Sequence, residues 1–194
     1  MMNLDLATAA GPRVVILVEG ASDQAALETL AQRRGRDLAA EGITVLPMGG
    51  ATSIGHYLDL LGPRGRNVQL AGLCDAAEED YFRRALDRAG FGSRPARADL
   101  EALGFYVCTA DLEDELIRAL GTTAVEQVIA GQGEIRSFRT FQKQPAQQHQ
   151  ATGDQLHRFM GTRSGRKSQY ARLLTGALDL TQVPRPLDLV LAHA

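Results

Sequence analysis

The chain has 194 residues, of which 44% are hydrophobic and 23% are charged, and its formal net charge is −2. This length and composition exclude a disordered or fibrous chain and suit one globular domain that buries its own core. No apolar run approaches the roughly 20 residues of a membrane helix, and the start lacks the basic and apolar regions of a secretory signal. We therefore expect a cytoplasmic protein with no membrane contact.

Four short apolar segments alternate with amphipathic segments in the first part of the chain. Residues 13–18, RVVILV, form a continuous β-branched run that predicts a strand buried on both faces. Three further strands are predicted at residues 43–47, 68–74 and 105–109. Helical spacing follows each strand, and Ser22 is the expected N-cap of the first helix. Strands that alternate with helices of about ten residues predict an α/β fold with a mainly parallel four-stranded sheet flanked by helices.

Beyond residue 120 the strand signals stop and helical spacing takes over. Helices are predicted at residues 122–129, 135–141, 154–160 and 168–178. A polar linker that contains a proline covers residues 142–150, and a tail with further prolines follows the last predicted helix. We therefore predict an α/β core over residues 12–120 and a helical C-terminal extension over residues 121–194, both within one compact domain.

Charge is distributed unevenly between these two parts. Residues 1–131 hold 12 Lys and Arg against 19 Asp and Glu, whereas residues 132–172 hold 8 against 2. An acidic body followed by a basic segment is typical of a protein whose partner carries phosphates, although a solvated Arg-rich helical surface explains the same pattern. Lysine is scarce, since Lys143 and Lys167 are the only two. Each lysine is therefore a candidate for a specific role.

Carboxylates stand at the ends of three predicted strands, at Glu19, Asp75 and Asp111. Parallel strands end at the same edge of their sheet, where ligands bind in open α/β folds. Asp23 and Glu113 follow within the next helical turn and can face the same edge. Five carboxylates repel one another there unless a cation balances them, and oxygen ligands favour Mg²⁺ or Mn²⁺. Taken singly, Asp23 or Asp111 at a helix start is explained more often as a cap than as a catalytic residue.

Four blocks of sequence, VVILVEGASD, GLCDAAEED, TADLEDELIRALG and FMGTRSGRKSQYA, occur in this order. Together they resemble the Toprim (topoisomerase–primase) domain, in the version found in ATP-dependent endonucleases of the OLD (overcoming lysogenization defect) family. The resemblance covers most of the chain. It implies a Toprim-type Rossmann-like fold and a nuclease that hydrolyses phosphodiester bonds of nucleic acid, DNA in particular, with one or two Mg²⁺ or Mn²⁺ ions.

The resemblance also implies roles for individual acids. Glu19 and Asp23 match the first acidic motif, which binds metal, and the Glu19 position can also serve in acid–base catalysis. Asp75 matches the first acid of the family's DxD motif, and Asp111 and Glu113 match its later acidic pair. These five residues are the predicted metal ligands.

The basic segment supplies the other implied roles. Lys167 matches the catalytic lysine, whose compact ammonium stabilises charge on the phosphate. Arg163 and Arg166 are predicted to hold backbone phosphates. The same role is expected of further arginines, namely Arg136, Arg139, Arg158 and Arg172. The chain departs from the family at the second acid of DxD, where Ala77 stands; either Glu78 reaches in, or water completes the coordination, or one metal is weakened.

The histidines and the missing motifs complete the sequence evidence. His56, His149, His157 and His193 have no metal-ligand spacing and are interpreted as scattered surface residues. The sequence contains no glycine-rich phosphate loop of the Walker type, so we expect no ATPase domain of its own, and any ATP dependence would need a separate ATPase partner.

Two other functional classes compete with a nuclease. The altered DxD motif also fits a weakly catalytic or non-catalytic metal-dependent nucleic-acid-binding module, or a nuclease subunit of an ATPase partner. A receiver-like phosphoacceptor domain ranks lower, because it needs adjacent acids after its first strand. Primase and topoisomerase activities would each need further domains. Nothing in the sequence indicates an oligomeric state.

Overall fold

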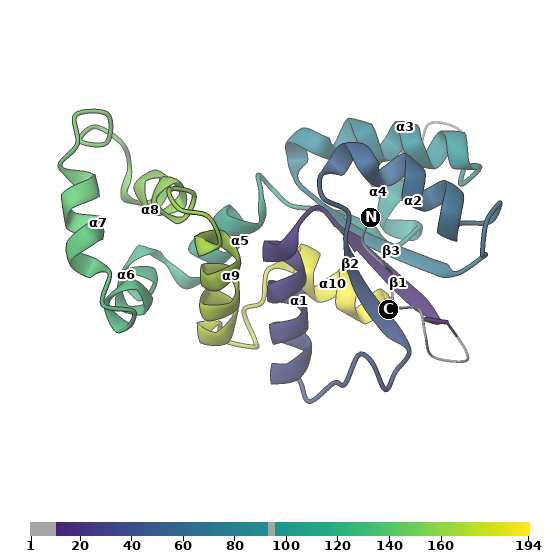
Figure 1. Ribbon diagram of the computed structural model, residues 1–194, viewed down its shortest axis with the longest axis horizontal. Helices are drawn as coiled ribbons and strands as arrows, with labels where there is room; N and C mark the ends of the chain where they lie inside the picture. Colours follow the sequence, from purple (N-terminus) through teal and green to yellow (C-terminus); the bar gives the residue numbers. More distant parts are fainter. Residues whose placement is uncertain (1–10, 93–95) are drawn as a thin grey trace.

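The computed structural model describes residues 11–92 and 96–194. Within these residues the chain forms one parallel four-stranded sheet in the order β2-β1-β3-β4 (Figure 1). Its strands are β1 (Val14–Val18), β2 (Ile43–Pro47), β3 (Gln69–Cys74) and β4 (Phe105–Val107). Residues of β1 are buried on both faces, as its continuous apolar run predicts. The predicted fold class is thereby confirmed.

Helices cover both faces of this sheet (Figure 1). The helices on one face are α2 (Ile54–Leu61), α3 (Glu79–Ala89) and α4 (Arg97–Ala102), and short 3-10 turns precede two of them, η1 (Ala51–Ser53) before α2 and η2 (Ala76–Glu78) before α3. Leu17 and Phe105 point into this layer. The helices on the other face are α1 (Ala21–Arg33) and α10 (Arg185–His193). Ile16 and Leu73 point into that layer, because side chains alternate along a strand.

The remaining helices extend the molecule beyond one end of the sheet (Figure 1). They are α5 (Leu112–Leu120), α6 (Thr122–Gly131), α7 (Ile135–Gln142), α8 (Thr152–Met160) and α9 (Arg166–Ala177). We call residues 122–165 the helical lobe. α9 returns to the core and packs along α1, where the Arg33 guanidinium donates to the carbonyl oxygens of Thr175 at 2.9 Å and Leu178 at 2.7 Å. None of the described helices is both long and apolar enough to cross a membrane.

Two local expectations were wrong. Ser22 lies inside α1 rather than at its N-cap, which is Gly20; the Gly20 backbone N–H donates to the Asp23 carboxylate at 2.9 Å. The Pro-containing tail is the helix α10, which begins after Pro184. Its prolines stand at the helix start, where no backbone donor is lost, and the buried residues of the helix recur at helical spacing.

Candidate metal centre

The carboxyl ends of β1, β3 and β4 form one edge of the sheet, and each leads into a predicted acid. Glu19 directly follows β1, Asp75 directly follows β3, and Asp111 comes shortly after β4. A backbone hydrogen bond joins the last two segments, since the N–H of Ala76 donates to the carbonyl oxygen of Ala110 at 2.9 Å. The parallel topology therefore brings together residues that are far apart in the sequence.

The turn after β2 closes one side of this edge. The backbone N–H groups of Gly49 and Gly50 both donate to the carbonyl oxygen of Glu19 at 3.1 Å. Both glycines have positive φ, 75° and 125°, which side chains disfavour, and a Cβ added at either would meet no atom within 4 Å. The turn thus fixes the backbone of Glu19 and leaves the space beside it open.

Glu113 is the most deeply buried acid of the site. It lies in the first turn of α5 and is 4% exposed. Its Oε2 accepts a hydrogen bond from Nζ of Lys167 at 3.3 Å, whereas its Oε1 is buried with no hydrogen-bond partner in the described structure. An unpaired buried carboxylate oxygen is costly, so this atom is a candidate ligand for a cation.

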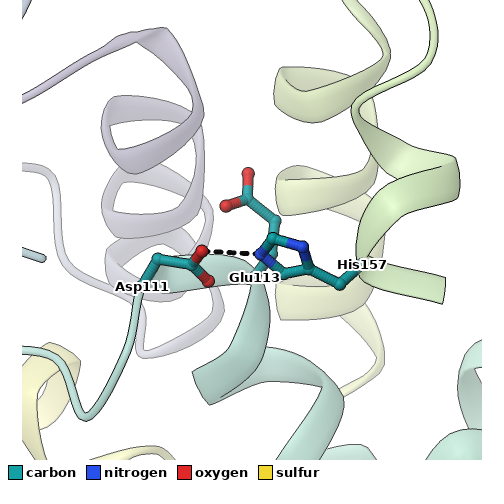
Figure 2. Close-up of side chains that lie close together, drawn as sticks. All are labelled: Asp111, Glu113 and His157. Carbon is teal, nitrogen blue, oxygen red and sulfur yellow. Dashed lines mark hydrogen bonds and ion pairs between the residues drawn. The ribbon is translucent and has the colours of Figure 1, made fainter. Parts of the chain in front are cut away.

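Asp111 and His157 contact each other directly (Figure 2). Asp111 is the N-cap of α5, where its Oδ1 accepts from the Asp114 N–H at 2.9 Å, and its Oδ2 lies 2.6 Å from Nε2 of His157 on α8. One ligand atom from each of Asp111, Glu113 and His157 lies within 4.8 Å of the others, so the three could hold a metal ion. The interpretation of His157 as a scattered surface residue was wrong. Because 46 residues separate it from Asp111, no local spacing could reveal the pair.

Burial and mutual repulsion raise the pKa of the acids around this cluster. Asp23 is 8% exposed, and its pKa is raised to about 6. Burial is the main cause, the hydrogen bond from Gly20 partly offsets it, and the charges of Glu113 and Glu19 add to the increase. For Asp75, burial is again the main cause, and the charges of Asp23, Glu19 and two further acids help to raise the pKa to about 7. The pKa of Glu19 is also raised, first by burial and then by Glu78. The five predicted acids therefore share one anionic site.

The pKa values of Asp111, His157 and Lys167 shift in the direction that favours their charged forms. Burial opposes the ionisation of Asp111, but hydrogen bonds from His157 and from the Asp114 N–H outweigh it and lower its pKa. The hydrogen bond to Asp111 raises the pKa of His157. Burial disfavours the charged form of Lys167, yet the neighbouring carboxylates, Glu113 first, raise its pKa overall. Lys167 therefore stays an ammonium at the border of the acidic site.

The position of the missing DxD acid is also defined. Ala77 is exposed in η2, while the next residue, Glu78, is half-buried and its charge raises the pKa of Glu19. The Glu79 carboxylate lies 3.9 Å from the Arg97 guanidinium. Of the alternatives that the sequence left open, the structure thus brings the Glu78 side chain within electrostatic reach of the site.

The arginines predicted to hold phosphates fall into two groups. Exposed arginines are Arg136, Arg139, Arg158, Arg163 and Arg172. Arg166 is instead 4% exposed, and its guanidinium donates to the Phe159 carbonyl at 3.1 Å, to Thr162 Oγ1 at 2.6 Å and to Glu134 Oε1 at 2.9 Å. It also lies 4.2 Å from the centroid of the Phe159 ring. The expected phosphate contact of Arg166 conflicts with this burial, because the side chain holds the segment between α8 and α9 in place.

Comparisons with known proteins agree with this fold. Residues 13–76 match the family described as "Overcoming lysogenization defect protein-like, TOPRIM domain". Solved structures of the same fold include the C-terminal region of the Burkholderia pseudomallei OLD protein, with a TM-score of 0.74 and 21% identity over 95% of this chain and 97% of that one. A search of curated proteins finds no match.

The C-terminal region of the Xanthomonas campestris pv. campestris OLD protein is also similar. Its structure phased with mercury has a TM-score of 0.72 and 25% identity over 94% of each chain, and that phased with platinum has 0.73 and 26% over 94% and 91%. Residues 13–76 thus match an OLD-like Toprim family, and the fold of most of the chain is similar to that of the C-terminal regions of OLD proteins. These findings confirm the resemblance found in the sequence. Glu19, Asp23 and Asp75 lie within the matched residues, whereas Lys167 lies outside them.

Proposed function

We propose that this chain is a divalent-metal-dependent nuclease that hydrolyses phosphodiester bonds of DNA at the carboxylate edge of its sheet. The observation that carries the proposal is the buried Glu113, which has one unpaired oxygen and lies 3.3 Å from the ammonium of Lys167. A site that combines an unsatisfied anion with a half-exposed cation suits a metal ion and a phosphate side by side. The OLD-like Toprim match supports this class of chemistry.

The residues present fit Mg²⁺ or Mn²⁺. Carboxylate oxygens are the ligands that these ions prefer. Burial first, and then the charges of neighbouring acids, raise the pKa values of Asp23 and Asp75, so a bound cation would favour their ionised forms. The ligands of one or two ions would be Glu19, Asp23, Asp75, Asp111 and Glu113. When bound, the metal would polarise the phosphodiester and lower the pKa of an attacking water.

The protein's own groups supply the remaining roles. The Lys167 ammonium, half-exposed, can turn from Glu113 to a phosphate oxygen and stabilise the negative charge that grows there in the transition state. Glu19 is half-buried with a raised pKa, so its carboxylate can accept a proton from water. His157 fixes the orientation of the Asp111 carboxylate and keeps it ionised.

Plasmid nicking in Mg²⁺ or Mn²⁺ tests the proposal. We expect the parent protein to nick supercoiled DNA and Lys167→Ala to lose about 10²-fold in rate, by analogy with the removal of one transition-state donor. Lys143→Ala is the matched control, since Lys143 is the only other lysine and is exposed in the linker. Circular dichroism would show that each variant remains folded. Equal nicking by Lys167→Ala and the parent would refute the role of this lysine.

A second candidate is a metal-dependent DNA-binding module, or the nuclease subunit of an ATPase partner. The exposed Ala77 favours it, because the second acid of the family's DxD motif is missing there. The 194 residues contain no phosphate-loop motif, so any ATP dependence would be supplied from outside these residues. Tight DNA binding without cleavage in several divalent ions would favour this candidate over the nuclease.

A further inference from the structure

A surface hollow of 470 Å³ lies in the helical lobe, between α7 and the segment that joins α8 to α9. Two aromatic rings contribute to its lining, the buried Phe159 and the half-buried Phe141, with ring centroids 5.7 Å apart. The exposed side chains of Arg136 and Arg163 also line it. The hollow therefore combines an apolar surface with accessible positive charge.

The charge of this lining sets the hollow apart. Its charged groups are all arginines, and no acid is among the described residues that line it. Three other surface hollows of the described chain mix arginines with acids, namely Glu28 and Asp37 beside β2, Asp80 and Asp87 on α3, and Glu101 and Glu115 beside β4. An anionic ligand would thus meet a carboxylate in each of those three hollows but not in the hollow of the helical lobe.

Two of the three arginines are available to a ligand. Arg166 is committed to Glu134, whose carboxylate also accepts from the Tyr170 hydroxyl at 2.8 Å. Arg163 is 67% exposed, and its guanidinium lies 3.7 Å from the same carboxylate. An exposed ion pair at this distance contributes little stability. Within the described residues, the guanidinium of Arg136 has no hydrogen bond or ion pair. Arg136 and Arg163 can therefore bind an anion without breaking a strong internal contact.

The hollow and the metal centre lie on opposite sides of the same helix. α8 lies between α5 and α7 (Figure 1), and it presents His157 to Asp111 and Phe159 to the hollow. A helix with its side chains is about 10 Å across, and successive nucleotides of a duplex strand are about 3.4 Å apart along the axis. Measured along a duplex axis, one helix width therefore equals the rise of about three nucleotides.

We propose that this hollow is a subsite for a backbone phosphate of the substrate strand, about three nucleotides from the bond cleaved at the metal centre. The proposal rests on the nuclease function proposed above. Arg136 and Arg163 bind the phosphate, and a phosphate contact holds the strand without reading its sequence.

Cleavage of short duplexes tests the subsite, with the double variant Arg136→Ala/Arg163→Ala and the control Arg66→Ala. Arg66 is an exposed arginine between α2 and β3, outside the hollow. We expect the double variant to raise KM about tenfold with kcat unchanged, and to reduce the slope of log KM against log salt by about 1 per lost phosphate contact. The control should behave like the parent.

A second measurement locates the contact along the strand. A single uncharged methylphosphonate in the duplex should suppress the parent's cuts at the bond about three nucleotides away on one side, and the double variant should lose this suppression. If the double variant cleaves with the parent's KM, salt slope and cut pattern, the subsite is refuted while the nuclease function stands.

Binding of the same duplexes without divalent metal, measured by fluorescence anisotropy, separates the two proposals. About tenfold weaker binding by the double variant supports the subsite even if the parent cleaves no DNA, and that result would overturn only the nuclease function. Equal binding by the parent and the double variant refutes the subsite in either case.

Discussion

Replacing Asp23 by Asn tests whether the buried acids bind metal or merely cap helices. Asp23 is 8% exposed, and burial raises its pKa from 3.8 to about 6. Between these two pH values the folded protein keeps a proton that the unfolded chain releases, so the stability of the metal-free protein falls as the pH rises through this window. A pKa shift of about two units lowers the free energy of unfolding by about 3 kcal/mol, and the full loss is reached above pH 6.

The Asp23→Asn variant should not show this loss of stability above pH 6. Asn is close to Asp in shape, and its side-chain oxygen can still accept from the Gly20 N–H, which lies 2.9 Å from the Asp23 carboxylate. In EDTA we therefore expect Asp23→Asn to be more stable than the parent by about 2–3 kcal/mol at pH 8 and equally stable at pH 3, as measured by urea unfolding. Mn²⁺ at 100 times its Kd should stabilise the parent by about 2.7 kcal/mol and the variant much less.

A lost cap would give the opposite result. If Asp23 only capped α1, the variant would be less stable by about 1 kcal/mol at pH 8, and Mn²⁺ would stabilise both proteins equally. That pair of results would refute the assignment of Asp23 to a metal site.

Three further changes have defined outcomes. His157→Ala removes the hydrogen bond that lowers the pKa of Asp111, so the acidic limb of the pH–rate profile for cleavage should move to higher pH; an unmoved limb would contradict the pairing. Glu134→Gln leaves the buried guanidinium on α9 without its counter-charge, and we expect urea unfolding to show a loss of about 2–3 kcal/mol. Gly72→Ala places a Cβ 2.6 Å from the buried Phe105 ring, which should cost about 1–3 kcal/mol; an unchanged Tm would show that the ring can move.

The sheet and its acidic edge could be predicted because their signals are local. A continuous β-branched run such as residues 14–18 predicts a buried strand without knowledge of its neighbours. Once the strands are taken as parallel, their carboxyl ends must share an edge, so Glu19, Asp75 and Asp111 come together by topology alone. The roles of these acids in catalysis stay predictions.

Other features of the structure were not predicted from the sequence. His157 reaches Asp111 only because α8 folds back against α5, and a histidine within a helix carries no mark of that contact. The helix α10 was not predicted, and its segment was described only as a tail with prolines, although a proline in the first turn is compatible with a helix. Its buried Leu187, Val190 and Leu191 have the helical spacing that could have revealed it.

Arg166 and Lys167 show how adjacent cations acquire different roles. Tyr170 and Leu174, one and two turns further along α9, are fully buried, so the same helix face extended backwards points Arg166 into the core. Lys167 is turned by about 100° from it and reaches the edge of that face, half-exposed and 3.3 Å from Glu113. The phase of the apolar residues, rather than the density of positive charge, therefore decides which cation is buried in the fold and which lies half-exposed beside the acidic site.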